Sequence, residues 1–554
     1  MKKSTCALLA LSGLLRAQQG PPQQNREANV SAVPYERILK AQKAEPQNWL
    51  TYSGNVLGQR YSELTQIKPD NVNNLEMQWA FQARSQEKFE ATPLVVDGVM
   101  YTVQAPNDVV ALDAVTGRTF WIYSYAPSTD ARPCCGHVNR GVAILGDTLY
   151  MATLDSHLVA IDAKNGHPLW TTEVASAKAG YAMTLAPLVV KDKIIVGVAG
   201  GEYGIRGFIS AYDAKTGKEA WKFYTIPGPG EPGHESWAGD SWKHGGAPVW
   251  LTGSYDSQTN LTYWGIGNPG PDYHGAQRGG DNLYSDCVVA LDATTGKLKW
   301  YFQFTPHDVY DYDAVQVPVL ADMDWKGKPR KLMLWANRNG FYYALDRTSG
   351  EFLEGKPFST VTWAKALDER GRPMRMMMDN EAKGGPAIYP GPIGATNWYS
   401  PSYSPRTGLF YIPAWENYHA VYSDAPAEFV EGRNYMGGTG RSTLPGLRAP
   451  QVLKRKQEDG YGTVRAIDPQ TGEKKWEFKM ADVTSSGILT TATDILFTGS
   501  REGYFSALDA RDGKLLWKVS VGGEIAMGPM TYQVNGKQYV AFAAGSSLFT
   551  FALR

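Results

Sequence analysis

An internal repeat of the form Ala-x-Asp-x-x-x-Gly-x-x-x-Trp constrains the fold of this 554-residue chain more than any other feature. In each copy an apolar run leads into the Asp, and a second run follows the Gly and ends at the Trp. This pattern predicts a β-hairpin, because an Asp side chain caps a turn and Gly tolerates the positive φ that the turn needs. Full copies begin at Ala111, Ala160, Ala211, Ala290, Ala466 and Ala507 and end at Trp121, Trp170, Trp221, Trp300, Trp476 and Trp517.

Two degenerate copies, at residues 344–350 and 403–408, bring the number of units to eight. The spacing of the copies leaves room for four strands in each unit. A single four-stranded sheet cannot bury both of its faces, so such sheets stack around an axis and close into a ring. We therefore predict an all-β fold, an eight-bladed β-propeller with tryptophan-docking repeats, in which each Trp packs between neighbouring sheets. The one helix that we expect is short and lies near residues 35–43.

The N-terminal residues have the composition of an export signal. Lys2 and Lys3 are positively charged, residues 6–15 are apolar, and Ala17 is a small residue suited to cleavage. We predict a signal peptide over residues 1–17, an N-terminal extension over 18–48 and a single propeller domain over 49–554. An uncleaved tail is the alternative. Because no apolar run approaches the about 20 residues that span a bilayer, we expect a periplasmic protein without a membrane span.

Charge and motif content exclude several classes of function. The 55 basic residues balance 55 acidic ones, so a nucleic-acid partner, which would need a basic surface, is not expected. Residues 265–270 match the dinucleotide pattern G-x-G-x-x-G, but the following Pro271-Asp272-Tyr273 does not begin a helix, so we reject a nicotinamide cofactor. The sequence contains no Cys-x-x-Cys-His motif, so we expect no haem domain in this chain.

Cys134 and Cys135 are adjacent, and two interpretations of the pair are open. A disulfide between them would strain the backbone, because consecutive Cα atoms lie about 3.8 Å apart whereas disulfides favour roughly 4.4 to 6.8 Å. Strain of this kind usually marks a functional site, and an oxidising compartment would allow the pair to close. The alternative is two free thiols that pack as small apolar side chains. Cys287, in an apolar run, is expected to be a buried strand residue.

The repeats, the adjacent cysteines and the Asn-Arg-Gly that follows them resemble the soluble alcohol dehydrogenases that depend on pyrroloquinoline quinone (PQQ). The resemblance covers nearly the whole chain after residue 48. It implies a PQQ ring clamped between a Cys134–Cys135 disulfide on one face and Trp250 on the other. It also implies that Arg140 binds a PQQ carboxylate and that Arg338 donates hydrogen bonds to the quinone oxygens. Further cofactor contacts that the resemblance implies are Glu90, Thr184 and Asn397.

The same resemblance implies one metal ion beside the quinone, held by Glu202, Asn268 and Asp311. All three side chains offer oxygen, which suits a hard cation. Asp311 also matches the general base of the family. Asp313 stands two positions later, where calcium-type members usually carry a small neutral residue and lanthanide-type members carry Asp. Alternation along a strand would place Asp311 and Asp313 on one side, and the added negative charge favours a lanthanide over Ca²⁺.

The resemblance implies the oxidation of primary alcohols to aldehydes, with Asp311 accepting the alcohol proton as hydride moves to the quinone. Electrons are expected to pass to a separate periplasmic cytochrome c, and a homodimer is one oligomeric state open to the protein. Residues 484–487 lack a Trp that methanol-type relatives carry near the cofactor, so ethanol and larger alcohols are favoured. The rival interpretations are a non-catalytic propeller scaffold and a quinoprotein dehydrogenase for another polyol or a sugar.

Overall fold

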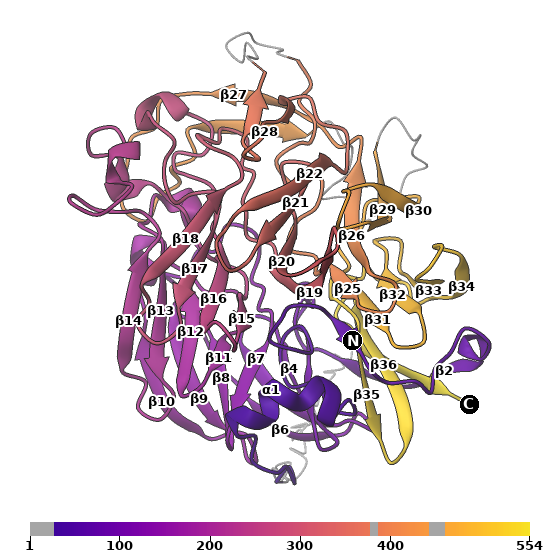
Figure 1. Ribbon diagram of the computed structural model, residues 1–554. Helices are drawn as coiled ribbons and strands as arrows, with labels where there is room; N and C mark the ends of the chain where they lie inside the picture. The colour runs from indigo at the N-terminus through magenta and orange to yellow at the C-terminus, as the bar shows by residue number, and fades with distance from the viewer. Residues whose placement is uncertain (1–26, 377–385, 443–459) are drawn as a thin grey trace, which may run out of the picture.

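The computed structural model describes residues 27–376, 386–442 and 460–554, so the predicted signal peptide over residues 1–17 lies outside the described residues. Within the described residues, the strands form eight sheets of four or five strands that follow one another around a ring (Figure 1). Each sheet is one blade, and the strands within it are antiparallel apart from the short added strand β1. The prediction of an eight-bladed β-propeller is confirmed.

The blades are numbered in chain order. The first four comprise β3 (Leu94–Val96), β4 (Val99–Gln104), β5 (Asp108–Asp113) and β6 (Thr119–Tyr123); β7 (Val142–Leu145), β8 (Thr148–Ala152), β9 (His157–Asp162) and β10 (Pro168–Glu173); β11 (Leu188–Val190), β12 (Lys193–Gly197), β13 (Phe208–Asp213) and β14 (Glu219–Tyr224); and β15 (Ser254–Asp256), β16 (Leu261–Gly265), β17 (Cys287–Asp292) and β18 (Leu298–Gln303).

The other four comprise β19 (Val319–Trp325), β20 (Lys328–Ala336), β21 (Phe341–Asp346) and β22 (Phe352–Pro357); β25 (Ser402–Ser404), β26 (Leu409–Glu416), β29 (Tyr461–Ile467) and β30 (Lys474–Lys479); β1 (Tyr61–Ser62), β31 (Ile488–Thr491), β32 (Ile495–Gly499), β33 (Tyr504–Asp509) and β34 (Leu515–Ser520); and β2 (Leu75–Gln82), β35 (Met530–Val534), β36 (Lys537–Ala544) and β37 (Ser547–Leu553). Two hairpins stand apart, β23 (Ala364–Leu367) with β24 (Pro373–Arg375) and β27 (Ala420–Asp424) with β28 (Gly438–Ser442).

The helical elements are short. The helix expected near residues 35–43 is α1 (Tyr35–Ala44), and none of the described helices is long and apolar enough to cross a membrane. Single 3₁₀ turns are η1 (Val72–Asn74), η2 (Ala177–Ala179), η3 (Gly201–Tyr203), η4 (His234–Ser236), η5 (Ser241–His244) and η6 (Gly275–Arg278).

The repeat forms the hairpin between the third and fourth strands of a blade, and its Trp docks onto the next blade. In the first copy, Asp113 Oδ1 accepts the N–H of Val115 at 2.8 Å, and Gly117 adopts a φ of 71°. Trp170 donates its indole N–H to the carbonyl of Ala214, 3.2 Å away in the following blade. A Cβ on Gly217 would approach the Trp170 ring to 2.7 Å, so only glycine fits there. The predicted docking of Trp between neighbouring sheets is confirmed.

One of the eight predicted units is wrong. Residues 403–408 join β25 to β26 within the blade whose docking repeat is the copy that begins at Ala466. Ser404 imitates the turn, since its carbonyl accepts the Gly408 N–H at 2.9 Å, but no atom lies within 4 Å of a Cβ built on Gly408. The eighth blade has no full repeat and instead joins β2, which carries Trp79, to β37 (Figure 1). The predicted number is therefore right, although one unit was misassigned.

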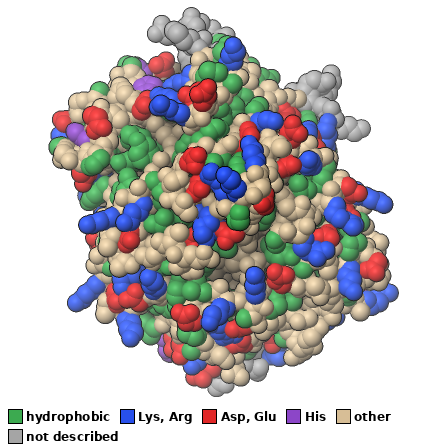
Figure 2. Space-filling model, viewed as in Figure 1, with side chains coloured by type: hydrophobic (Ala, Val, Ile, Leu, Met, Phe, Trp, Pro, Cys, Tyr) green, Lys and Arg blue, Asp and Glu red, His purple; other side chains and the backbone are tan. Residues whose placement is uncertain are grey.

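The fold gathers loops from many blades at one end of the ring. The first strands of neighbouring blades, such as β7 and β11 or β19 and β25, contact one another and so lie nearest the axis. Because adjacent strands are antiparallel, the start of a first strand and the end of a second strand lie at the same edge of a blade. The predicted site residues all lie on loops of these two kinds. On the face drawn in Figure 2, side chains of both charges are interspersed.

Candidate active site

The predicted cofactor and metal residues come from six loops that enter first strands and three that leave second strands. The entering loops carry Glu90 before β3, Cys134, Cys135 and Arg140 before β7, Thr184 before β11, Trp250 before β15, Asp311 and Asp313 before β19, and Asn397 before β25, while Glu202, Asn268 and Arg338 follow β12, β16 and β20.

Arg140 is the centre of one group of these side chains. Its guanidinium lies 2.8 Å from Glu90 Oε2 and donates to Thr184 Oγ1 at 2.9 Å. The guanidinium carbon lies 5.0 Å from the centre of the Trp250 ring and 4.9 Å from that of Trp398. Arg140 is therefore held between two indoles and a carboxylate, and the structure brings four of the predicted cofactor residues together.

Arg338 is the centre of a second group. Its Nη1 lies 3.1 Å from Asp311 Oδ1 and its Nη2 lies 3.0 Å from Asp313 Oδ2. Asn397 accepts a further hydrogen bond from Nη2 through its side-chain oxygen at 3.3 Å. The two aspartates contact one guanidinium and so lie on the same side, as predicted, while their shared coordination of an ion stays a prediction. The reason given for it was wrong, because the segment is not a strand and Asp311 has a left-handed φ of 64°.

Asp313 links the two groups. Its Oδ2 accepts the indole N–H of Trp250 at 3.1 Å, and its Oδ1 accepts the backbone N–H of Asn268 at 2.7 Å. A Cβ on Gly267 would collide with Asp313 Oδ1, so glycine at position 267 allows this approach. The indole, a metal-ligand candidate and the Asp313 carboxylate therefore form one connected site.

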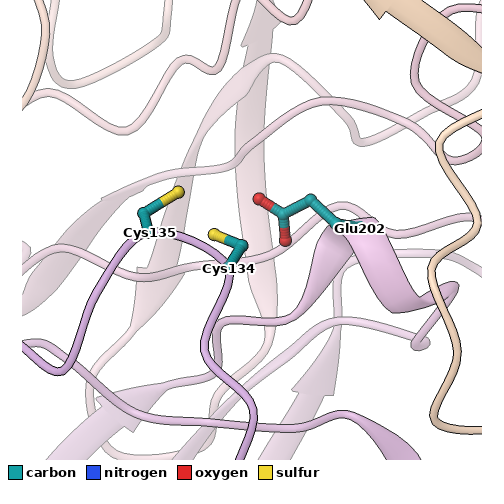
Figure 3. A group of neighbouring side chains, drawn as sticks. All are labelled: Cys134, Cys135 and Glu202. Atoms are coloured by element: carbon teal, nitrogen blue, oxygen red, sulfur yellow. The ribbon is translucent and has the colours of Figure 1, made fainter. Parts of the chain in front are cut away.

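Cys134 and Cys135 lie beside the Glu202 carboxylate, with the two sulfurs and a carboxylate oxygen all within 4.8 Å of one another (Figure 3). Both cysteines are free thiols, which contradicts the disulfide that the family resemblance implies and agrees with the alternative of two free thiols. The short Cα separation of consecutive residues opposes ring closure. The hydrogen bond with Cys135, then burial, and then the nearby Glu202 carboxylate hold the pKa of Cys134 well above its usual value. Cys287 is free and buried in β17, as expected.

The site concentrates carboxyl groups in a poorly solvated region. Burial raises the pKa of Glu202, and the charge of Asp313 adds to this shift. Burial also raises the pKa of Asp311 well above its usual value, although Arg338 opposes the shift. Burial would lower the pKa of Arg338, but the charges of Asp313 and Asp311 outweigh it and raise that pKa. These carboxyl groups therefore need additional positive charge to ionise together.

The segment between β27 and β28 covers the loops that carry two of the metal-ligand candidates. The N–H of Tyr435 donates to the carbonyl of Glu202 at 2.7 Å, and the N–H of Tyr273 donates to the carbonyl of Met436 at 2.9 Å. The rings of Phe429 and His244 stack with their centres 3.4 Å apart.

Two further residues of the site were not predicted. Trp398 packs against Arg140, and only its position next to Asn397 could have indicated it. Asp272 is buried, and its carboxyl group acts electrostatically on Glu202 and Asp313. It follows the rejected dinucleotide pattern in the same loop as Asn268, which is the signal that could have found it.

Among the described residues, the acidic side chains of Glu202, Asp311 and Asp313 do not all lie within 4.8 Å of one another.

The residues fit a planar acidic cofactor and an oxygen-bound cation. The Nε atoms of Arg140 and Arg338 are buried and have no hydrogen-bond partner. Each guanidinium therefore keeps a donor for an acceptor from outside the chain, and PQQ offers both carboxylate and quinone oxygens. Trp250 supplies an indole face, and Glu202, Asn268, Asp311 and Asp313 supply oxygen donors for a hard cation.

Comparison with known proteins agrees with this geometry. The family of PQQ-dependent enzymes described as glucose/ethanol/alcohol dehydrogenase, β-propeller domain, matches residues 49–355 and 357–540. The chain belongs to this family of quinoprotein dehydrogenases.

Three proteins to which the chain is similar match it over most of their length. The quinoprotein alcohol dehydrogenase PedH of Pseudomonas putida is 38% identical over 542 residues, which cover 93% of this chain and 89% of the relative. The lanthanide-dependent methanol dehydrogenase of Methylacidiphilum fumariolicum is 36% identical, with coverage of 92% and 86%. The solved structure of a europium-containing methanol dehydrogenase superimposes with a TM-score of 0.87 at 33% identity, covering 94% of this chain and 100% of that one.

Proposed function

We propose that this protein oxidises primary alcohols to aldehydes in the periplasm, using PQQ and one bound metal ion, and passes the electrons to a separate cytochrome c. The observation that carries the proposal is the Arg338 group. One guanidinium holds both Asp311 and Asp313, while its Nε is buried without a partner. A base and a donor for the cofactor are thereby fixed to each other, an arrangement that a non-catalytic scaffold does not need.

When bound, PQQ supplies the hydride acceptor and the metal ion supplies Lewis acidity. Asp311 accepts the proton of the substrate hydroxyl, and its side chain is 25% exposed, so a small alcohol can reach it. Arg338 holds Asp311 in place and favours its ionised form. Arg140 and Glu90 would bind and orient the acidic cofactor, and Trp250 and Trp398 would shield it from water.

We further propose that the ion is a lanthanide. Glu202, Asp311 and Asp313 bring three carboxylates to the site, and Arg338 is the basic group that pairs with the two aspartates. The negative charge that remains suits a trivalent ion better than a divalent one. The similarity to a lanthanide-dependent methanol dehydrogenase supports this preference.

The test is to load the purified protein with PQQ and either La³⁺ or Ca²⁺ and to assay ethanol oxidation with an artificial electron acceptor. We expect higher activity with La³⁺. Asp313→Ala should reduce the La³⁺-dependent activity by about 100-fold or more, because a ligand is lost and Arg338 loses an ion-pair partner. Tb³⁺ luminescence excited through Trp250, whose N–H bonds to Asp313, measures ion binding independently of turnover.

Asp70→Ala removes an exposed carboxylate that belongs to none of the site loops and is the matched control, expected to leave activity and Tb³⁺ binding unchanged. If the parent protein showed no activity with either ion, the result would contradict the proposed dehydrogenase and favour the non-catalytic scaffold. Activity with Ca²⁺ alone would contradict the lanthanide preference while leaving the dehydrogenase in place.

A further inference from the structure

Cys134, Cys135 and Glu202 form a group whose chemistry differs from that of the oxygen donors around it (Figure 3). The two sulfurs and one carboxylate oxygen all lie within 4.8 Å of one another, and no other three cysteine, histidine or acidic side chains of the described residues come together in this way. A tetrahedral Zn²⁺ with Zn–S bonds of about 2.3 Å holds two sulfurs about 3.8 Å apart. The group is therefore already close to the size of a zinc site.

The backbone that carries Glu202 is fixed without an ion. Glu202 lies in η3, directly after Gly200, which has a left-handed φ of 116°. A Cβ on Gly200 would collide with the carbonyl oxygen of Gly180, so only glycine fits there. The Glu202 carbonyl also accepts the N–H of Tyr435 at 2.7 Å. A tight turn thus presents the carboxylate to the two cysteines.

The two thiols are accessible to a ligand from outside the chain. Both cysteines are exposed, although the protein around Cys134 is dense enough for burial to contribute to its raised pKa. Packing as small apolar side chains therefore does not account for the pair. The Cys134 thiol shares hydrogen bonds with Cys135 and with the Glu202 carboxylate, so protons now link three electron-rich groups. A divalent ion that binds two thiolates and one carboxylate replaces these links and releases the two thiol protons.

We propose that Cys134, Cys135 and Glu202 bind a thiophilic divalent ion of the zinc type in the reduced protein. Thiolates select ions such as Zn²⁺, whereas hard cations prefer oxygen donors, so this site differs in chemistry from that of the proposed cofactor ion. Three protein ligands leave the fourth position of a tetrahedron to water. Glu202 is also a ligand candidate for the cofactor ion, so the two ions compete, a consequence that rests on the proposed function.

The experiment titrates the reduced protein, without PQQ, with Cd²⁺ as a spectroscopic substitute for Zn²⁺ and follows the ultraviolet thiolate-to-Cd²⁺ charge-transfer absorption. We expect one strong site in each chain. Cys135→Ser should weaken Cd²⁺ binding about 100-fold or more, because even the loss of an outer partner of a metal ligand costs about 10- to 100-fold. Glu202→Gln, which keeps the shape and removes the charge, should weaken it about tenfold and serves if Cys135→Ser fails to fold.

Cys287→Ala is the matched control, because this third thiol is also free but is buried in β17. It should leave Cd²⁺ binding unchanged. Absence of thiolate absorption in the parent, an unchanged affinity in Cys135→Ser, or an equal loss of affinity in Cys287→Ala would overturn the inference.

The competition is tested separately with Tb³⁺ luminescence. Zn²⁺ should displace Tb³⁺ from the parent at lower concentrations than from Cys135→Ser. Simultaneous binding of both ions would show that Glu202 is not shared and would overturn the competition. A parent that does not bind Tb³⁺ at all would contradict the proposed lanthanide site, and the Cd²⁺ titration would still decide whether the thiol site exists.

Discussion

At the scale of single residues, Asp286 is a buried carboxyl group for which neither the site nor the fold provides a partner. It is fully buried, and neither of its oxygens has a hydrogen-bond partner. Burial raises its pKa well above the usual value, and the charges of Asp308 and Asp313 add to the shift. The folded state therefore binds a proton that the unfolded chain releases above a pH of about 4.

This linkage predicts a pH-dependent effect of Asp286→Asn. A raised pKa in the folded state means that the contribution of Asp286 to stability is present below its unfolded pKa and is lost as pH rises. The variant should be more stable than the parent at pH 8 by about 1–3 kcal/mol, and the difference should vanish towards pH 4. Thermal unfolding at both pH values measures it.

Asp308→Asn is the control for this prediction. The Asp308 oxygens accept the N–H groups of Tyr310 at 3.0 Å and of Tyr312 at 2.8 Å, so this substitution should destabilise the protein. If Asp286→Asn destabilised the protein at pH 8 as well, the carboxyl group would have a partner in solution that this arrangement lacks.

Single residues also show how far the site could be predicted. Arg140, Glu90 and Thr184 were implied by the family resemblance, and they come together because each precedes the first strand of a blade. Asp272 and Trp398 were missed because their roles depend on which loops meet across the ring, and spacing along the chain does not encode this. The closed cysteine ring was wrong because an adjacent pair in a sequence does not specify whether its sulfurs are bonded.

At the scale of elements, the hairpin between the third and fourth strands of a blade allows a test of what its turn glycine contributes to stability. Gly117 and Gly408 have similar φ angles of 71° and 68°. A Cβ on Gly117 would lie 2.6 Å from the Trp79 ring, whereas one on Gly408 would meet no atom within 4 Å. Gly408→Ala should cost only the backbone strain of a left-handed alanine, about 1 kcal/mol. Gly117→Ala should cost about 2 kcal/mol more, because the indole must also move.

Urea unfolding of the two variants checks this prediction, since both substitutions add the same methyl group to a turn glycine. Equal losses of stability in the two variants would mean that the Trp79 indole moves aside at no energetic cost. The pair also explains the misassigned unit, because Ser404 and Gly408 share the turn pattern of the repeat but lack the indole against it. A local pattern predicts the turn, whereas docking requires a neighbouring blade.

At the scale of the whole molecule, Trp79 docks the eighth blade, which contains both β2 and β37, onto the first blade. It lies on β2 opposite Thr550 of β37, and its indole N–H donates to the carbonyl of Ala114 at 3.2 Å in the first blade. Trp79→Ala should cost about 3–5 kcal/mol and should lower the hydrogen-exchange protection of residues 547–553. Trp170→Ala removes a similar docking contact between the second and third blades, and it should leave the hydrogen-exchange protection of β37 unchanged. Unchanged protection in Trp79→Ala would show that β2 stays paired without its indole.

Most of the whole-molecule architecture was predictable, because a repeat with a fixed hairpin and a docking Trp specifies the blade and its neighbour. The closure was not, because the eighth blade takes β2 from before the first repeat and three strands from after the last. No copy of the pattern marks that junction, and the agreement in number came from a turn in the sixth blade.

The pairing of β2 with β37 means that the last blade can be completed only at the end of synthesis. The ribosome makes β2 near the start of the chain and makes its partner β37 last, after the strands of all the other blades. In the interval the nascent chain presents a bare strand edge that can pair with a neighbouring copy, which is a route to aggregation. The yield of active protein in a cell should therefore depend on how fast the final strand arrives and on which chaperone shields the first one.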